Sequence, residues 1–264
     1  MSRLKDAFTR LRLEKKTGLV TFVMAGDPDM DRAAVVLESL DQAGADVLEI
    51  GVPFSDPLAD GPVIQRSAER ALKSGSTLSS TLDLVGRLRA RLSAGIVIFS
   101  YANPLLAMGF DTFASRAADA GVDGVLVLDL PIEEAGELRD AVCEFNIDPI
   151  FLLSPTTTQE RIRRAADLGG GFLYGISRLG VTGERETVAI GAKELVERIR
   201  RVTSMPLALG FGISRPEHVV EVGRLAEAAV VGSGLVKRIA EVPSGADLAD
   251  EVKKYVRWLK GETR

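Results

Sequence analysis

Short apolar runs of strand length recur along the chain, and each is followed by a segment with helical spacing. The eight runs cover residues 19–24, 47–51, 96–101, 124–128, 149–153, 172–176, 206–209 and 228–231. Apolar residues recur with a helical period after each run, and glycine stands at several of the expected helix ends. Regular alternation of strand and helix predicts parallel strands that are joined by helical crossovers.

The number of repeats distinguishes a closed sheet from an open one. Eight strand–helix units in 264 residues fit a (β/α)8 TIM barrel, for which about 250 residues is typical, better than an open doubly wound sheet. Helical spacing over residues 2–13 adds an N-terminal helix before the first strand, and residues 246–259 predict a closing helix. We therefore predict an α/β fold, with one TIM-barrel domain over residues 1–264, the extra N-terminal helix and additional helices.

Composition and charge exclude several classes of function. Apolar residues make up 46% of the chain and charged residues 27%, and the net charge is −4 with both signs mixed along the sequence. This is an ordinary globular balance, and it contains no basic footprint for nucleic acid. No apolar run approaches the ~20 residues that a membrane helix needs. The charged N-terminus does not contain the apolar core of a signal peptide, so we expect a cytoplasmic protein.

The chain has a single cysteine, Cys143, and a single histidine, His218, which narrows the chemistry. One cysteine excludes an internal disulfide and a cysteine metal cluster, and one histidine excludes a multi-histidine site, so no metal is expected. We expect His218 on the surface of the helix that follows residues 210–214. Carboxylates are then the leading candidates for acid–base catalysis.

Glu49 interrupts the apolar run 47–51, and Asp60 lies in the proline-rich loop that follows. A strand that is buried on both faces should consist of Val, Ile and Leu, so a glutamate there needs a partner or a cavity. Burial raises the pKa of a carboxyl group, which suits a group that must both give and take protons near neutrality. We predict Glu49 as a general acid/base with Asp60 as a second carboxylate. The alternatives are a structural carboxylate at Glu49 and a turn residue at Asp60.

Glycine turns follow the last two predicted strands, at residues 210–214 (GFGIS) and 232–234 (GSG). Glycine lets backbone N–H groups approach an anion, and a helix N-terminus behind the turn adds partial positive charge. In TIM barrels the loops after strands seven and eight often bind phosphate. The alternative is that these glycines only form tight turns. Residues 178–183 belong to a longer polar loop with the composition of a lid that would exclude water.

Five motifs, spread over nearly the whole chain, resemble the alpha subunit of tryptophan synthase. They are residues 26–28 (GDP), 48–62 (LEIGVPFSDPLADGP), 101–104 (YANP), 177–183 (SRLGVTG) and 210–214 (GFGIS). The resemblance implies reversible cleavage of indole-3-glycerol phosphate to indole and glyceraldehyde 3-phosphate. It also implies that Glu49 moves the protons, and that Asp60 accepts a hydrogen bond from the indole N–H while positive charge develops on the ring.

The resemblance implies roles for further residues as well. Substrate-positioning roles fall to Tyr174, Thr182, Phe22, Tyr101 and Phe211, and phosphate-binding roles to Gly183, Gly210, Gly212, Gly232 and Ser233. Pro53, Asp56 and Pro57 would contact a partner beta subunit in an alpha2beta2 assembly. That partner would carry pyridoxal phosphate and receive the indole, whereas this chain would need no cofactor of its own.

Two other functions remain open at this point. A different phosphate-binding barrel enzyme of sugar-phosphate metabolism would share the glycine turns, but it would not predict the motif from Glu49 to Asp60. A non-catalytic regulatory subunit would only activate its partner, and the presence of both carboxylates is evidence against it.

Overall fold

The computed structural model describes residues 2–176, 191–210, 212–243 and 247–262. Nine parallel strands form one sheet in these residues. They are β1 (Gly18–Met24), β2 (Val47–Gly51), β3 (Gly95–Ser100), β4 (Gly124–Val127), β5 (Asp148–Ile150), β6 (Leu152–Leu153), β7 (Leu173–Ile176), β8 (Leu207–Gly210) and β9 (Ala228–Val231). Each of the eight predicted runs therefore contains strand, and the prediction of parallel strands is confirmed.

The sheet is a nearly closed barrel. Its strand order is β5-β4-β3-β2-β1-β9-β8-β7-β6. The two ends of this order, β5 and β6, are consecutive pieces of one predicted strand that is interrupted at Phe151. β5 pairs with β4 and β6 pairs with β7, so the chain itself joins the two edges of the sheet. The TIM-barrel prediction is confirmed, and the split strand is the fifth of the eight predicted runs.

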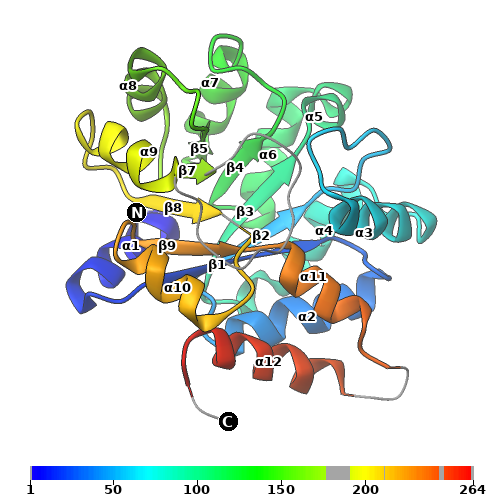
Figure 1. Ribbon diagram of the computed structural model, residues 1–264. Helices are drawn as coiled ribbons and strands as arrows, with labels where there is room; N and C mark the ends of the chain where they lie inside the picture. Colours follow the sequence, from blue (N-terminus) through cyan, green and yellow to red (C-terminus); the bar gives the residue numbers. More distant parts are fainter. Residues whose placement is uncertain (1, 177–190, 211, 244–246, 263–264) are drawn as a thin grey trace.

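Helices surround the strands on the outside of the barrel (Figure 1). They are α1 (Arg3–Glu14), α2 (Met30–Gln42), α3 (Pro62–Lys73), α4 (Leu78–Leu88), the 3-10 helix η1 (Arg89–Arg91), α5 (Ala102–Met108), α6 (Phe110–Ala120), α7 (Gly136–Glu144), α8 (Gln159–Leu168), α9 (Gly191–Arg200), α10 (Pro216–Gly223), α11 (Ser233–Ala240) and α12 (Leu248–Leu259). Apolar residues of most of these helices pack against the outer face of the sheet and form the largest core cluster. The apolar residues of α1 belong instead to the cluster inside the barrel, and those of α3 belong to a third, smaller cluster. That the chain is one domain stays a prediction.

The helix α5 begins within residues 101–104, which the sequence analysis singled out only as a motif after the third strand. Pro104 lies in the first turn of α5, where the backbone N–H has no intrahelical acceptor and proline is tolerated. The backbone N–H of Ala102 donates to Asp129 Oδ1 at 2.7 Å and so finds a partner outside the helix. Asn-Pro therefore begins a helix here, although the same dipeptide is more typical of a turn.

The N-terminal helix α1 closes the end of the barrel at which the strands begin. Its buried Leu4 and Phe8 join the cluster of side chains inside the barrel, and the rings of Phe8 and Phe172 lie 5.0 Å apart. Glycines at the strand starts make room for it, because a methyl group on Gly95 would lie 2.6 Å from Leu4 Cδ2. The predicted extra helix is thus part of the core.

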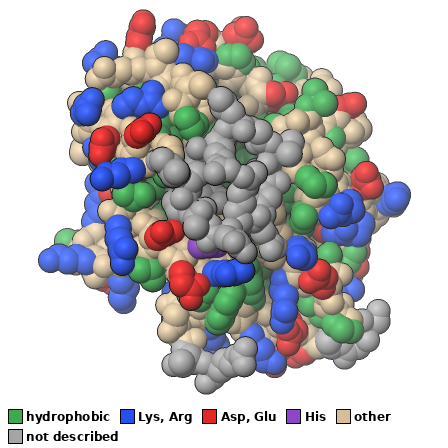
Figure 2. Space-filling model, viewed as in Figure 1, with side chains coloured by type: hydrophobic (Ala, Val, Ile, Leu, Met, Phe, Trp, Pro, Cys, Tyr) green, Lys and Arg blue, Asp and Glu red, His purple; other side chains and the backbone are tan. Residues whose placement is uncertain are grey.

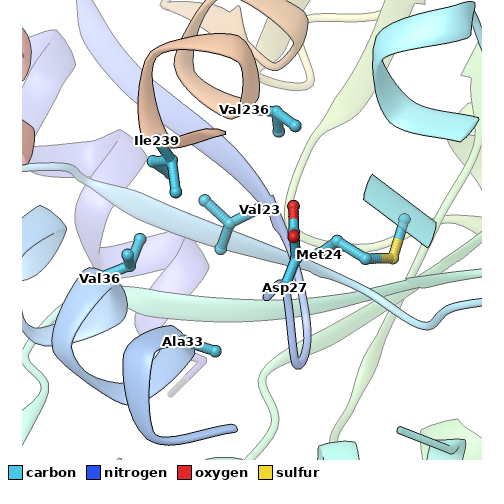
Figure 3. Close-up of a pocket in the computed structure, with 7 residues that line it drawn as sticks. All are labelled: Val23, Met24, Asp27, Ala33, Val36, Val236 and Ile239. Atoms are coloured by element: carbon cyan, nitrogen blue, oxygen red, sulfur yellow. The ribbon is translucent and has the colours of Figure 1, made fainter. Parts of the chain in front are cut away.

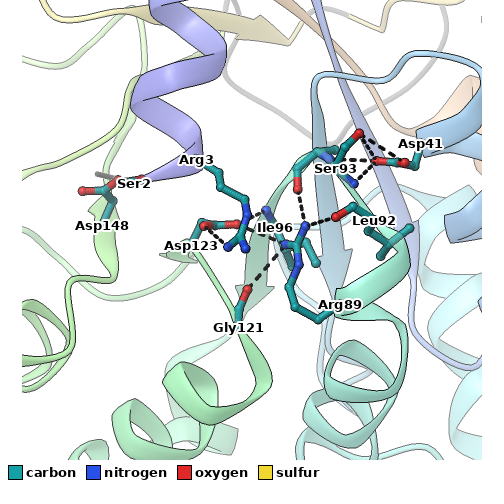
Figure 4. A network of polar contacts seen from close by, with 11 residues as sticks. Ser2, Arg3, Asp41, Arg89, Leu92, Ser93, Ile96, Gly121, Asp123 and Asp148 are labelled. Carbon is teal, nitrogen blue, oxygen red and sulfur yellow. Dashed lines mark hydrogen bonds and ion pairs between the residues drawn. The ribbon is translucent and has the colours of Figure 1, made fainter.

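Acidic side chains surround α1 at this end of the barrel, and arginines bind them. Asp123 accepts from Arg3 and from Arg89, each at 3.3 Å, and from the backbone N–H of Ile96 at 2.9 Å (Figure 4). Asp46 accepts from Arg10 Nη2 at 2.5 Å. Each acid therefore holds the helix or a neighbouring strand in place.

The surface carries both signs of charge. Figure 2 shows Lys and Arg side chains interspersed with Asp and Glu around the face that it presents. In the described ranges, no helix is both long enough and apolar enough to cross a membrane.

Candidate active site

Glu49 is the middle residue of β2, and its side chain lies inside the barrel. Side chains two apart on a strand share a face, and Val47 belongs to the cluster inside the barrel. Glu49 is only 1% exposed, and neither of its carboxylate oxygens has a hydrogen-bond partner among the residues that the structure describes. Burial raises the pKa of the Glu49 carboxyl group to about 8. The group is therefore protonated at neutral pH.

Asp60 reaches the same region from the loop between β2 and α3. It is 7% exposed, and its Oδ2 accepts a hydrogen bond from the Tyr101 hydroxyl at 3.0 Å. Burial raises the pKa of Asp60 to about 6, although the hydrogen bond from Tyr101 opposes this shift. Asp60 is thus mostly ionised at neutral pH, where Glu49 is neutral. Two carboxyl groups with separated pKa values can act as an acid and as a fixed negative charge.

One cavity brings most of the predicted site residues together at the end of the barrel where the strands finish. Its lining comes from β1, β2, β3, β7, β8 and β9, from loops that follow them and from the first turns of α3 and α11. The lining residues are Phe22, Glu49, Asp60, Ile64, Phe99, Tyr174, Ile176, Gly210, Gly212, Val230, Gly232 and Ser233. The cavity therefore combines two acids, apolar walls and glycine turns.

The apolar walls include four residues that were not predicted: Ile64, Phe99, Ile176 and Val230. Strand alternation could have found Phe99, Ile176 and Val230, because each stands two positions from an inward-facing residue on the same strand. Phe99 packs edge-on against Phe22, with ring centroids 5.1 Å apart. Ile64 is one turn into α3, and no pattern in the sequence directs it to this cavity.

Tyr174 lies on β7 and is buried in the cavity. Its pKa is raised well above its ordinary value by burial and by the nearby Glu49 and Asp60, so the hydroxyl stays protonated. A methyl group on Gly210 would lie 3.2 Å from the Tyr174 hydroxyl. A larger residue at Gly210 would therefore crowd Tyr174.

The glycine turns contribute Gly210, Gly212 and Gly232 to the lining of the cavity. Gly212 has a φ of 69°, which glycine adopts readily. Gly232 precedes the first turn of α11, and Ser233 is the first residue of that helix. The unpaired N–H groups at a helix N-terminus and the helix dipole favour an anion. The arrangement fits the expected phosphate-binding role of these residues, which stays a prediction.

Three predicted site residues, Thr182, Gly183 and Phe211, lie outside the described residues, as does the lid proposed for residues 178–183. Tyr101 lies in the described part of the chain, but it stands behind Asp60 and does not line the cavity. Its expected substrate-positioning role stays a prediction.

The residues expected to contact a partner lie in the loop after β2, beside the cavity. Asp56 is exposed, Pro57 is half-buried and Pro53 is buried. Leu58, in the same loop, is 88% exposed. An apolar side chain of this size on the surface is compatible with a docking surface, and the contact itself stays a prediction.

Asp27 is a third buried acid at this end of the barrel, but it is fully paired. Arg70 binds it through two nitrogens, each at 2.6 Å, and Ser67 donates a further hydrogen bond. Figure 3 shows Asp27 at the edge of a small apolar cavity that is also lined by Val23 and Val236. Asp27 therefore anchors the loop after β1 to α3, and it is not available as a proton carrier.

The expectation that His218 lies on the surface is wrong. His218 is 5% exposed, and its Nδ1 accepts a hydrogen bond from the backbone N–H of Ser214 at 3.3 Å. It lies on the inward face of α10 beside Val222, so it supports the glycine turn from behind. In the described part of the chain, no three His, Cys, Asp or Glu side chains gather closely enough to hold a metal ion.

Comparison with known proteins agrees with this geometry. The family model described as tryptophan synthase alpha chain matches residues 8–263. The tryptophan synthase alpha chain of Citrifermentans bemidjiense is 49% identical over 260 residues, which is 98% of this chain and 97% of the relative. The chain belongs to the tryptophan synthase alpha chain family. This family gives it a lyase role in tryptophan synthesis.

Solved structures of the family share the fold over all or most of the chain. A structure of Mycobacterium tuberculosis tryptophan synthase superposes with a TM-score of 0.91 at 32% identity, covering 100% of this chain and 98% of the other. A structure of the tryptophan synthase complex from Pyrococcus furiosus gives 0.84 at 38% identity, covering 92% and 98%. The TIM barrel of this chain is therefore the fold of the solved family members.

Proposed function

We propose that the chain cleaves indole-3-glycerol phosphate reversibly to indole and glyceraldehyde 3-phosphate. One observation supports this function most strongly. Glu49 is a buried, neutral carboxylic acid without a hydrogen-bond partner among the described residues, and it shares a cavity with an ionised Asp60. A buried polar group without a partner is costly to stability, so the cost is consistent with selection for a function.

The reaction needs a proton on one carbon and the removal of a proton from one oxygen. Protonated Glu49 gives its proton to the indole ring carbon that bears the glycerol chain, and the ring becomes an electron sink. The resulting Glu49 carboxylate then takes the proton from the adjacent glycerol hydroxyl. The carbon–carbon bond breaks as the aldehyde forms, its electron pair returns to the ring, and Glu49 is again protonated.

Asp60 acts on the nitrogen of the ring. Protonation of the ring carbon places positive charge on that nitrogen, and an ionised carboxylate at a fixed position lowers the energy of this state. Asp60 is ionised when the pH is above its pKa of about 6. Glu49 is protonated when the pH is below about 8. The two requirements overlap around neutral pH, where both groups are in the working form.

The remaining roles concern the position of the substrate. Phe22 and Phe99 offer an apolar wall for the flat ring, and Tyr174 lines the same cavity beside Gly210, near enough to both acids to interact with them. Backbone N–H groups of Gly210, Gly212 and Gly232, with Ser233, would hold the phosphate. Thr182, Gly183 and Phe211 keep the roles that the resemblance implies.

We further propose that the chain works in the cytoplasm with a tryptophan synthase beta subunit, in an alpha2beta2 assembly. The Pyrococcus furiosus structure is a tryptophan synthase complex, which supports the partner. The loop with Pro53, Asp56 and Pro57 would contact it, and the exposed Leu58 adds apolar surface there. Pyridoxal phosphate is expected in the beta subunit, and this chain supplies indole to it without a cofactor of its own.

The direct test mixes the purified chain with indole-3-glycerol phosphate and follows the release of indole, with and without a beta subunit. We expect indole to form, and faster with the partner present. If the chain stimulates the beta subunit but releases no indole from this substrate under either condition, it is a regulatory subunit and the proposed reaction is wrong.

A further inference from the structure

Tyr101 joins the acid Asp60 to the backbone of the loop that carries it. Tyr101 immediately follows β3 and precedes α5, and it is 5% exposed. Its hydroxyl accepts a hydrogen bond from the backbone N–H of Ala59 at 3.1 Å and donates one to Asp60 Oδ2 at 3.0 Å. A phenol hydroxyl has a single proton to donate, so Tyr101 uses it on Asp60.

The ring of Tyr101 is itself held from several sides. The Phe54 ring packs on it with centroids 5.2 Å apart. Ser100 Oγ donates to the Tyr101 carbonyl at 2.9 Å, and Asp129 fixes the following residue, Ala102, at 2.7 Å. Because the ring is anchored in this way, the position of its hydroxyl is fixed. The hydroxyl can therefore fix the position of the Asp60 carboxylate to which it donates.

We propose that Tyr101 is a positioning residue, whose hydroxyl fixes the orientation of the Asp60 carboxylate and couples it to the loop of residues 53–59. This inference rests on the proposed function, in which Asp60 stabilises the charged ring nitrogen. Because Tyr101 does not line the cavity, it acts through Asp60. The same hydroxyl also holds Ala59, so a movement of this loop on partner binding would be transmitted to the carboxylate.

The surroundings of Asp60 make this hydrogen bond important. Asp60 shares the cavity with Glu49 from β2 and Tyr174 from β7, and Asp129 from the segment after β4 acts on Tyr101. None of these groups carries a positive charge. Burial raises the pKa of Asp60, and the hydrogen bond from Tyr101 lowers it. Loss of the hydroxyl therefore raises the pKa of Asp60 further.

The test is Tyr101→Phe, which removes only the hydroxyl, read as the pH profile of kcat/KM for indole release. We expect the lower limb, set by Asp60, to move up by about one pH unit, the size of effect of one hydrogen bond to a charged group. The upper limb, set by Glu49, should keep its place. A lower limb that stays at its original pH would overturn the proposal.

Two further variants separate positioning from a general structural effect. Tyr255→Phe removes a hydroxyl that donates to the Ser214 carbonyl outside the cavity at 3.3 Å, and it should leave the lower limb in place. In an Asp60→Asn background, Tyr101→Phe should lower kcat less than twofold, against about tenfold in the unmodified chain at pH 7, because interacting residues are not additive. Equal losses in both backgrounds would contradict the proposal.

A measurement without turnover keeps the inference separate from the proposed reaction. The Asp60 carboxyl is followed by carbon-13 NMR titration, with its signal assigned by its loss in Asp60→Asn. The titration midpoint should be higher in Tyr101→Phe than in the unmodified chain. Equal midpoints would refute the positioning role whether or not the chain releases indole, whereas a shifted midpoint without indole release would refute the reaction alone.

Discussion

The two ends of the barrel hold buried or partly buried acids in opposite surroundings. At the end where the strands begin, Asp123 accepts hydrogen bonds from two arginines and a backbone N–H. Glu227 accepts from Arg12 and from Arg200, at 2.9 and 2.6 Å. At the end where the strands finish, Glu49 has no partner among the described residues. We therefore expect the acids at the first end to stabilise the fold and Glu49 to destabilise it.

The pKa values follow from this difference. Burial alone would raise the pKa of Glu227, but the backbone N–H of Leu207 and the arginines lower it below its ordinary value. Glu49 has no such partner, and burial raises its pKa to about 8. Asp27, at the same end as Glu49, is paired with Arg70. The lack of a partner is therefore a property of the Glu49 position and is not shared by every acid at this end.

The comparison predicts that loss of Glu49 affects the rate and not the fold. Glu49→Gln keeps the size of the side chain but can carry no proton between atoms, so indole release should fall at least about 10³-fold, within the range of general acid–base catalysis. Steady-state assays measure it, with circular dichroism as the control for folding. Near-normal turnover in this variant would exclude Glu49 as the proton carrier.

The same variant should change how stability depends on pH. The folded-state pKa of Glu49 is raised from 4.5 to about 8, so the folded chain retains a proton that the unfolded chain releases. Stability therefore falls as the pH rises from about 4.5 to about 8 and is level above this range. Glu49→Gln removes this contribution. Urea titrations at several pH values measure the free energy of unfolding of both proteins. From about pH 4.5 to about pH 8 the free energy of unfolding of Glu49→Gln should rise relative to that of the unmodified chain. A difference between the two proteins that does not change with pH would contradict the raised pKa of Glu49.

Loss of the second acid should have a smaller effect. Asp60→Asn replaces the fixed charge by a neutral amide, and we expect kcat to fall about 10²–10³-fold, the cost of one preorganised charge contact. Stopped assays of indole measure the loss. An unchanged kcat would show that the ring nitrogen does not depend on Asp60.

At the opposite end the effect should be on stability alone. Asp123→Ala leaves the half-buried Arg89 and the backbone N–H of Ile96 without this acceptor, and we expect a loss of about 3 kcal/mol in the free energy of unfolding. The matched control is Asp83→Ala, which removes an exposed pair with Arg116 and should cost less than about 1 kcal/mol. Equal losses, or a lower kcat of the folded Asp123→Ala enzyme, would contradict the division between the two ends.

The smallest effect concerns the glycine turns. Glycerol 3-phosphate at about ten times its dissociation constant should raise the melting temperature by roughly 3 °C, because it binds the folded state alone. Differential scanning fluorimetry measures the shift, and glycerol without phosphate is the control. The same shift with glycerol would show that the site does not recognise the phosphate.

The sequence predicted the features that interrupt a local pattern. Glu49 was found because a charge stood within an apolar strand, and the glycine turns because they followed the last two strands. The pairs of acids and arginines at the other end were not predicted, since Asp123 and Arg3 are 120 residues apart and Glu227 and Arg12 are 215 apart. Pairs at such separations leave no local signal. The burial of His218 was also missed, because only the packed structure shows which face of its helix points inward.

The protonation state of Glu49 in the free protein is the most direct test of the central claim. Infrared difference spectra between the unmodified chain and Glu49→Gln report the carboxyl group itself, without substrate or partner. We predict a protonated carboxylic acid band at pH 7 that is replaced by a carboxylate band with a midpoint near pH 8. A carboxylate band already present at pH 7 would contradict the claim that the barrel keeps this acid buried, neutral and ready to give a proton.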